Sequence, residues 1–182
     1  MKKERFDAIT DAVLAIIITI MVLELKIPEL TTENIPQIVQ QIAVYSLSFL
    51  SISILWMNHH HIFIHNERVS LNVVWTNFCL LFITSLIPLA TAPLSEHFFQ
   101  RSSHIFYAAV LGTNTLIYTL LQDQNAKYSK IKIKPSIHWM NWLASALYFS
   151  SIPLSHFSLY LSGAVFVLCP ALYFTLSKKG FD

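Results

Sequence analysis

Residues 5–24 of the chain read RFDAITDAVLAIIITIMVLE, a largely apolar segment with charged residues near both ends. Its apolar part runs only from Ala12 to Leu23, whereas a helix needs about 20 residues to cross the hydrocarbon core of a bilayer. A crossing helix therefore carries Asp11 into the membrane with it. An ionisable residue at that depth usually faces protein or water, so Asp11 is a candidate functional residue. A helix cap or a place in the headgroup layer would also explain it.

The composition of the whole chain indicates a membrane protein. The 182 residues are 54% hydrophobic and only 12% charged, whereas a soluble domain has about 25% charged residues. The apolar runs are long and do not alternate with polar residues, which favours helices over a transmembrane barrel. The net charge is only +2, with basic residues in loops, so we expect no nucleic-acid partner. Both cysteines fall in apolar stretches, which indicates packed thiols.

The apolar runs predict six transmembrane helices in one transmembrane domain, residues 1–182. No small-residue cleavage site follows the basic N-terminus, so we interpret the first run as a retained helix. Four prolines predict helix edges (Pro28, Pro36, Pro93 and Pro135), and three fall within or at the ends of spans (Pro88, Pro153 and Pro170). The fold class is an all-α integral membrane protein with spans near 6–27, 36–63, 71–94, 102–121, 137–154 and 157–176.

The basic residues predict the orientation in the membrane. Placing both termini in the cytoplasm puts ten of the twelve Lys and Arg residues inside and leaves only Lys26 and Arg101 outside. This agrees with the positive-inside rule and requires an even number of spans. Four spans would have the same parity. We therefore expect a multi-pass protein of the cell (plasma) membrane, in contact with the lipid bilayer and with both termini cytoplasmic.

One stripe of the first helix carries candidate functional residues. At about 100° per residue, Ile16, Thr19, Ile20 and Leu23 share one side of the helix. Asp11 projects roughly 140° away from Ile16 and is expected to face the bundle. A stripe of Ile and Leu on a membrane helix is usually a lipid-facing or packing surface. A pore role for the stripe therefore needs support from elsewhere in the sequence.

Residues 56–65, at the end of the second span, read WMNHHHIFIH. The spacing places Trp56, His59, His60 and Phe63 on one face. We favour a structural interpretation, in which His59 or His60 donates to Asp11 or packs near Arg5. Because histidine titrates near neutrality, a proton-sensing role is also open.

Two further polar features lie in these spans. His61 and His65 are four residues apart, so they could share a metal ion, although the sequence offers no nearby Cys and no obvious third ligand. The third span carries Asn77, and then Thr84 and Ser85 ahead of Pro88. Amides and hydroxyls buried in a membrane commonly join helices, so we interpret these as structural.

The order of these motifs resembles the lysosomal transmembrane potassium channel family and its bacterial relatives. Each repeat of that family opens with Arg-x-x-x-Phe-Ser-Asp. Here Arg5 and Asp11 match, and Ile9 and Thr10 replace the Phe and the Ser. The resemblance covers roughly the first half of the chain and continues through Leu23–Pro28, Trp56, His59, His60, Phe63, Asn77 and the Leu-Ile-Pro run ending at Pro88.

The resemblance implies a potassium channel, not an enzyme, built as a homo-oligomer, namely a homotetramer of six-helix subunits. The first helix of each subunit would line the pore without a re-entrant loop, and the permeant ion would be potassium, with no cofactor and no metal. Ile16 would form the narrowest apolar ring, with Ile20 and Leu23 as further rings and Thr19 between them. An inter-helix network would position this helix and control gating through Arg5, Asp11, Trp56, His59, His60 and Asn77.

Two other classes of function remain open on the residues alone. Asp11 could be the coupling site of a small secondary cation transporter or proton-coupled transporter, whose flux would be slow and saturable. The His run could hold a metal ion or a haem in a membrane enzyme.

Overall fold

The structure, a computed structural model, describes residues 1–64, 66–127 and 135–177, which are helical apart from short connections. The six predicted spans correspond to six helical rods, one of them made of α3 and α4 in succession. The all-α membrane fold is therefore confirmed. The elements are α1 (Lys3–Leu23), η1 (Thr32–Asn34), α2 (Ile35–Phe63), α3 (Leu71–Ser85), α4 (Ile87–Glu96), α5 (Arg101–Ala126), α6 (Pro135–Phe157) and α7 (Leu159–Ser177).

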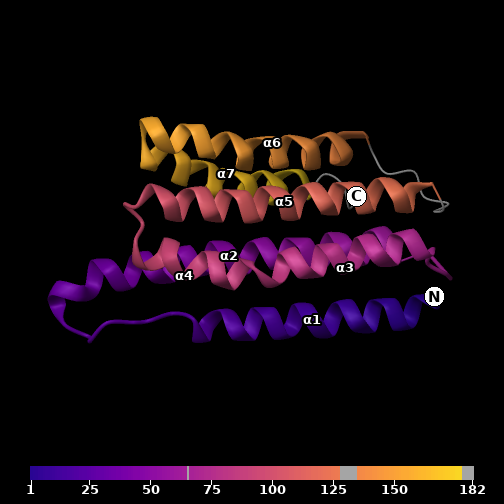
Figure 1. Ribbon diagram of the computed structural model, residues 1–182, viewed down its shortest axis with the longest axis horizontal. Helices are drawn as coiled ribbons and strands as arrows, with labels where there is room; N and C mark the ends of the chain where they lie inside the picture. Colours follow the sequence, from indigo (N-terminus) through magenta and orange to yellow (C-terminus); the bar gives the residue numbers. More distant parts are fainter. Residues whose placement is uncertain (65, 128–134, 178–182) are drawn as a thin grey trace.

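The rods lie side by side and alternate in direction along the chain (Figure 1). α1 lies at one edge of the bundle and packs against α2, α3 and α4, whereas α5, α6 and α7 pack together on the other side. Within the described residues, four stretches are long and apolar enough to cross a membrane, namely α1, residues 32–63, residues 71–96 and α5. The helix that the sequence predicts to line a pore is thus at one edge of the bundle.

The observed helix ends differ from the predicted ones where charge and proline intervene. α1 ends at Leu23 and not at residue 27, because Glu24, Lys26 and Pro28 follow, and the chain continues without helix to Thr31. α5 continues past residue 121 to Ala126, and Asn125 donates there to the carbonyl of Ile62, 2.7 Å away. This bond gives the polar end of α5 a partner on α2.

The structure also corrects one prediction about a proline and one about a cysteine. Pro93 was predicted at a helix edge, but it lies inside α4, which ends three residues later at Glu96. Pro88 lies in the first turn of α4, directly after the break that separates α4 from α3. That position tolerates proline, since its nitrogen would have no partner within the helix. Cys169 is buried as expected, whereas Cys79 is exposed on the surface of the chain.

Buried hydroxyl groups join three helices in the middle of the bundle. The Oγ1 atom of Thr91 on α4 lies 2.8 Å from Oγ of Ser48 on α2, and Ser48 Oγ lies 2.9 Å from the hydroxyl of Tyr107 on α5. All three side chains are buried. Since lipid offers no hydrogen-bonding partner, such contacts hold helices in register. Ser48 is the shared member of the cluster.

Replacing Ser48 by Ala is expected to destabilise the folded chain, because both inter-helix contacts of the cluster are lost. By analogy with hydrogen bonds between membrane helices, the free energy of unfolding should fall by about 0.6–1.7 kcal/mol. Denaturant titration in detergent micelles measures it. Ser46→Ala is the control, since the exposed Ser46 hydroxyl donates only to the carbonyl of Ile42 on its own helix, 2.7 Å away. Equal losses in the two variants would contradict the role of the cluster.

Candidate functional site: the edge helix and its support

α1 has one covered face and one bare face. The covered face consists of buried residues spaced three or four apart, Phe6, Thr10, Leu14, Ile17 and Met21. On the bare face, Ile16 is 56% exposed, Ile20 43% and Leu23 80%. Thr19 is exposed between them. All four residues of the predicted stripe therefore lie on the side of α1 that the rest of the chain leaves uncovered.

The stripe of Ile16, Thr19, Ile20 and Leu23 contains one polar group, the Thr19 hydroxyl. It donates to the carbonyl of Ile16 in its own helix, 2.8 Å away. Because the proton is used inside the helix, the lone pairs of the oxygen remain available on the outer side. Thr19 can therefore act as an acceptor or as a cation ligand.

An apolar groove of about 350 Å³ follows one flank of the stripe, where α1 meets α3 and α4. Pro88 and Leu89 of α4 form one wall, and Ile16 and Ile20 of α1 belong to the other. Glu24 closes the groove at the end of α1. The stripe is thus the rim of a concave apolar surface and not an isolated ridge.

A chain of hydrogen bonds fastens the covered face of α1 to α2 and α3. Nε2 of His59 lies 3.0 Å from Oδ1 of Asn77, and the amide nitrogen of Asn77 donates to Oγ1 of Thr10 at 2.9 Å. The Thr10 hydroxyl then donates to the carbonyl of Phe6 at 3.1 Å. The side chains of Thr10, His59 and Asn77 are all buried. The chain is directional, because an amide oxygen only accepts, so Nε2 of His59 must carry the proton.

Aromatic packing supplements these hydrogen bonds. The ring of Phe6 stacks on His59 with centroids 5.5 Å apart, and it meets Phe63 edge-on at 4.8 Å. His59 and Phe63 are themselves 4.8 Å apart. Such pairs contribute about 0.5–1.5 kcal/mol each beyond the area they bury. The start of α1 is therefore fixed against the end of α2.

Asp11 is held by Trp56, and not by a histidine as we expected from the sequence. Nε1 of Trp56 donates to Oδ1 of Asp11 at 2.8 Å, on the exposed side of the α1–α2 contact. His59 faces the interior and is bonded to Asn77, so it is directed away from Asp11. His60 stacks on Trp56 with ring centroids 6.1 Å apart. His60 therefore lies beside Trp56, the side chain that donates to Asp11.

Arg5 lies outside this network in the single chain. Its side chain is exposed and forms no hydrogen bond or ion pair with any residue in the described ranges. Its neighbours Lys3 and Asp7 form an ion pair at 2.6 Å. The aromatic ring of Phe6 anchors this end of α1, together with main-chain hydrogen bonds between Met1 and Val69.

One member of the predicted histidine pair for a metal ion, His65, lies outside the described residues. Over the parts of the chain that are described, no three His, Cys, Asp or Glu side chains gather closely enough to hold a metal ion. The exposed His61 lies one residue beyond His60 on α2.

Sequence reasoning missed the two side chains of α1 that attach it to the bundle, Phe6 and Thr10. A signal for them was present, because residues 6, 10, 14, 17 and 21 form a second helical stripe as regular as that of Ile16. Thr10 interrupts the apolar pattern of this stripe. Its partner on another helix, Asn77, could not be identified from spacing alone.

Comparison with known proteins identifies the family. The sequence model of the endosomal/lysosomal potassium channel TMEM175 matches residues 5–88, which cover most of α1 and all of α2 and α3. A potassium channel from Chryseobacterium sp. strain P1-3 is 33% identical over 98% of this chain and 96% of its own length. The chain belongs to the TMEM175 family. Since this family consists of potassium channels, the prediction that the chain is not an enzyme is confirmed.

Another TMEM175 relative has a solved structure. A potassium channel from Chamaesiphon minutus is 28% identical over 96% of this chain and 94% of its own length. The crystal structure of a lysosomal potassium-selective channel TMEM175 homolog from that organism superposes with a TM-score of 0.75 and 28% identity, covering 96% of each chain. The likeness therefore extends well beyond the first half of the chain, where the motifs lie.

Replacing Asn77 by Leu is expected to destabilise this TMEM175 chain, because the replacement has similar size but leaves His59 and Thr10 without their buried partner. The loss in unfolding free energy should be about 1–3 kcal/mol. Denaturant titration of the purified protein measures it. Asn72→Leu is the control on the same helix, because Asn72 is exposed.

A double-variant cycle with Thr10→Val identifies the source of the loss. If the hydrogen bond carries it, the losses of Thr10→Val and Asn77→Leu will be strongly non-additive. Full additivity would show that the two side chains act separately.

Proposed function

We propose that the chain is the subunit of a potassium-selective channel of the plasma membrane, a homotetramer in which the four α1 helices surround the pore. Both termini lie in the cytoplasm, and no cofactor takes part. Membership of the TMEM175 family and the names of the relatives from Chryseobacterium and Chamaesiphon support potassium as the permeant ion. The charge distribution supports the orientation, with ten of twelve basic residues on the cytoplasmic side.

The observation that carries the proposal is the bare face of α1. In an isolated subunit, the uncovered side of the edge helix would expose Thr19 and the charged Asp11 and Glu24 to lipid. Exposure of ionisable groups to lipid is costly, so such groups usually face protein or water. A ring of subunits with α1 at the centre provides both surroundings, since the stripe then faces water and the flanks face neighbouring subunits.

Ile16 forms the narrowest ring of this pore, and Ile20 and Leu23 form further apolar rings. An apolar ring offers no oxygen atoms to replace the hydration shell of an ion, and it can close the pore by losing its water. Such a ring favours the cation that gives up water more easily, which is potassium rather than sodium. The Thr19 oxygens, with their lone pairs directed outward, add partial coordination between the apolar rings.

The polar residues around α1 hold the helix in position and do not determine the ion selectivity. Asn77 and His59 hold the covered face, and Trp56, supported by His60, holds Asp11. These contacts set the rotation of α1, which decides how far Ile16 projects toward the pore axis. Arg5 continues the bare face toward the N-terminus, where its partner belongs to a neighbouring subunit. Glu24, exposed at the opposite end of α1, raises the local concentration of cations by its charge.

Ile16→Asn is the first test, because it replaces the apolar ring by amides that coordinate either cation. We expect wild-type protein in liposomes to carry a large potassium flux, and the variant to carry a flux with a lower ratio of potassium to sodium. Val22→Asn is the matched control, since Val22 is 48% exposed on the same helix but lies roughly 120° away from Ile16 around its axis. Its selectivity should remain that of the wild type.

Two other outcomes would contradict the proposed mechanism. A slow, saturable flux that Ile16→Asn leaves unchanged would favour a transporter that uses Asp11 as its coupling site. Equal loss of selectivity in Ile16→Asn and Val22→Asn would show that the stripe does not define the pore.

Trp56→Phe tests whether Trp56 positions α1 without affecting ion selectivity, because the variant keeps an aromatic ring and removes the donor to Asp11. We expect fewer assembled or open channels, seen as a smaller flux per mole of protein, with an unchanged potassium to sodium ratio. Trp75→Phe is the control, since Trp75 is 64% exposed on α3 and its ring meets that of Phe78 on the same helix. A changed ion ratio in Trp56→Phe would contradict a purely positioning role.

A further inference from the structure

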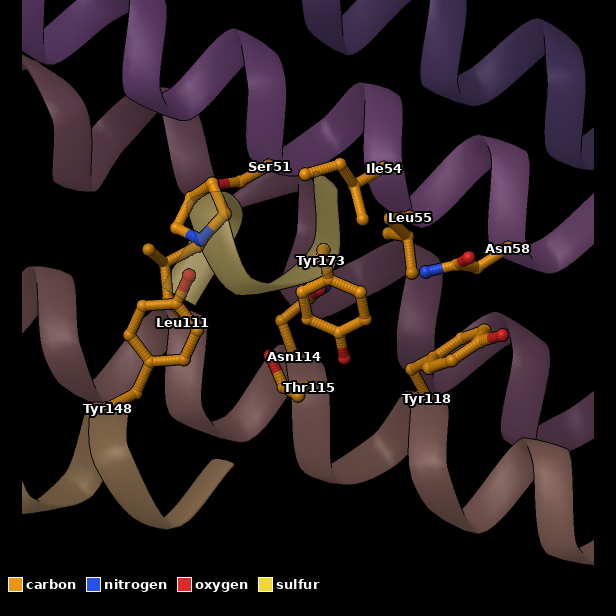
Figure 2. Close-up of a pocket in the computed structure, with 11 residues that line it drawn as sticks. Ser51, Ile54, Leu55, Asn58, Leu111, Asn114, Thr115, Tyr118, Tyr148 and Tyr173 are labelled. Atoms are coloured by element: carbon orange, nitrogen blue, oxygen red, sulfur yellow. The ribbon is translucent and has the colours of Figure 1, made fainter. Parts of the chain in front are cut away.

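A small chamber with polar groups in a mainly apolar lining lies on the side of α2 away from the edge helix. It has a volume of about 40 Å³ and is lined by residues of α2, α5, α6 and α7. Figure 2 shows Asn58 of α2, Tyr118 of α5 and Tyr173 of α7 around the same space, with Tyr148 of α6 at the far side. None of these residues belongs to the stripe or to the network that supports α1.

Three side chains at the chamber have polar groups without a protein partner. Among the described residues, the amide of Asn58, the hydroxyl of Thr115 and the hydroxyl of Tyr118 form no hydrogen bond. Tyr118 is only 4% exposed. By contrast, Tyr173 donates to Asn141, and Asn114 donates to Thr84 at 2.6 Å. Three polar groups without a protein partner therefore border the same chamber.

A buried polar group without a partner costs about 1–3 kcal/mol, and the surrounding bilayer offers no alternative partner. This cost applies first to Tyr118, which is buried, whereas Asn58 and Thr115 are half-buried. Apolar cavities in proteins stay dry, whereas polar ones hold water when they provide about 10–15 Å³ for each molecule and two to four partners. A chamber of about 40 Å³ has room for about three water molecules.

The lining argues against a cation as the occupant. It contains amides, hydroxyls and apolar side chains but no carboxylate, and burying an ion without a counter-charge is far more costly than burying a neutral molecule. The ligand is therefore small, neutral and able both to donate and to accept hydrogen bonds. Water has this chemistry and fits the volume.

We propose that the chamber is a binding site for a cluster of about three water molecules, held by Asn58, Thr115 and Tyr118 and separate from the ion pore. The cluster joins α2 to α5 where direct contacts between their polar groups are lacking. Asn58 immediately precedes His59, so the water cluster and the support of the pore helix are attached to the same turn of α2.

Radiolytic hydroxyl labelling of the assembled protein in nanodiscs tests the proposal, because a short X-ray pulse makes radicals from bound water that modify the nearest side chains. Mass spectrometry then gives the labelling rate of each tyrosine. We expect Tyr118 and Tyr173 to be labelled about tenfold faster than Tyr107, which is buried away from the chamber. Rates no faster than that of Tyr107 would show a dry chamber and overturn the proposal.

Variants make the test specific to this site. Asn58→Leu fills the chamber with an apolar group and should lower the rate at Tyr118 and Tyr173 to near that of Tyr107, whereas Asn72→Leu should leave it unchanged. An unaltered rate in Asn58→Leu would mean that the water comes from elsewhere, and would overturn the site. A rate that falls only when potassium replaces N-methylglucamine would show that a cation displaces the water. Because labelling needs no ion flux, its outcome is independent of the proposed channel activity.

Discussion

The contact that the rest of the proposed mechanism depends on is the buried amide of Asn77, which joins α1, α2 and α3 through Thr10 and His59. Helices in a membrane gain little from apolar contact with each other, since lipid is as apolar as their side chains, so polar contacts decide their register and rotation. Asn77 uses both ends of its amide, one as acceptor and one as donor. That arrangement fixes the rotation of α1 about its axis.

A fixed rotation gives α1 two separate tasks. Phe6, Thr10 and Leu14 turn inward and attach the helix, and the opposite side is then free to present Ile16 and Ile20. The polar residues near the stripe, Thr19 and Glu24, need no partner inside the subunit. In the proposed channel, this edge helix would lie at the centre of the assembly.

The sequence was sufficient for the spans and for the bare stripe, because both depend on one-dimensional periodicity and on the length of apolar runs. It was insufficient for contacts between helices. Trp56 and His59 lie three residues apart, and spacing alone could not decide which of them reaches Asp11, since that depends on the rotation of α2 against α1. Charge and proline marked the end of α1 at Leu23 four residues earlier than we predicted. The division into a single domain, residues 1–182, stays a prediction.

The two cysteines, Cys79 and Cys169, differ in their exposure. Cys169 is buried between helices, whereas Cys79 is exposed on α3 near Trp75 and Phe82. The native chain thus offers one reactive position on its outer surface and shields the other. A spin label on Cys79 would place one reporter on each subunit without any engineered cysteine. The set of distances between such labels depends on the rotational symmetry of the assembly, so it would count the subunits directly.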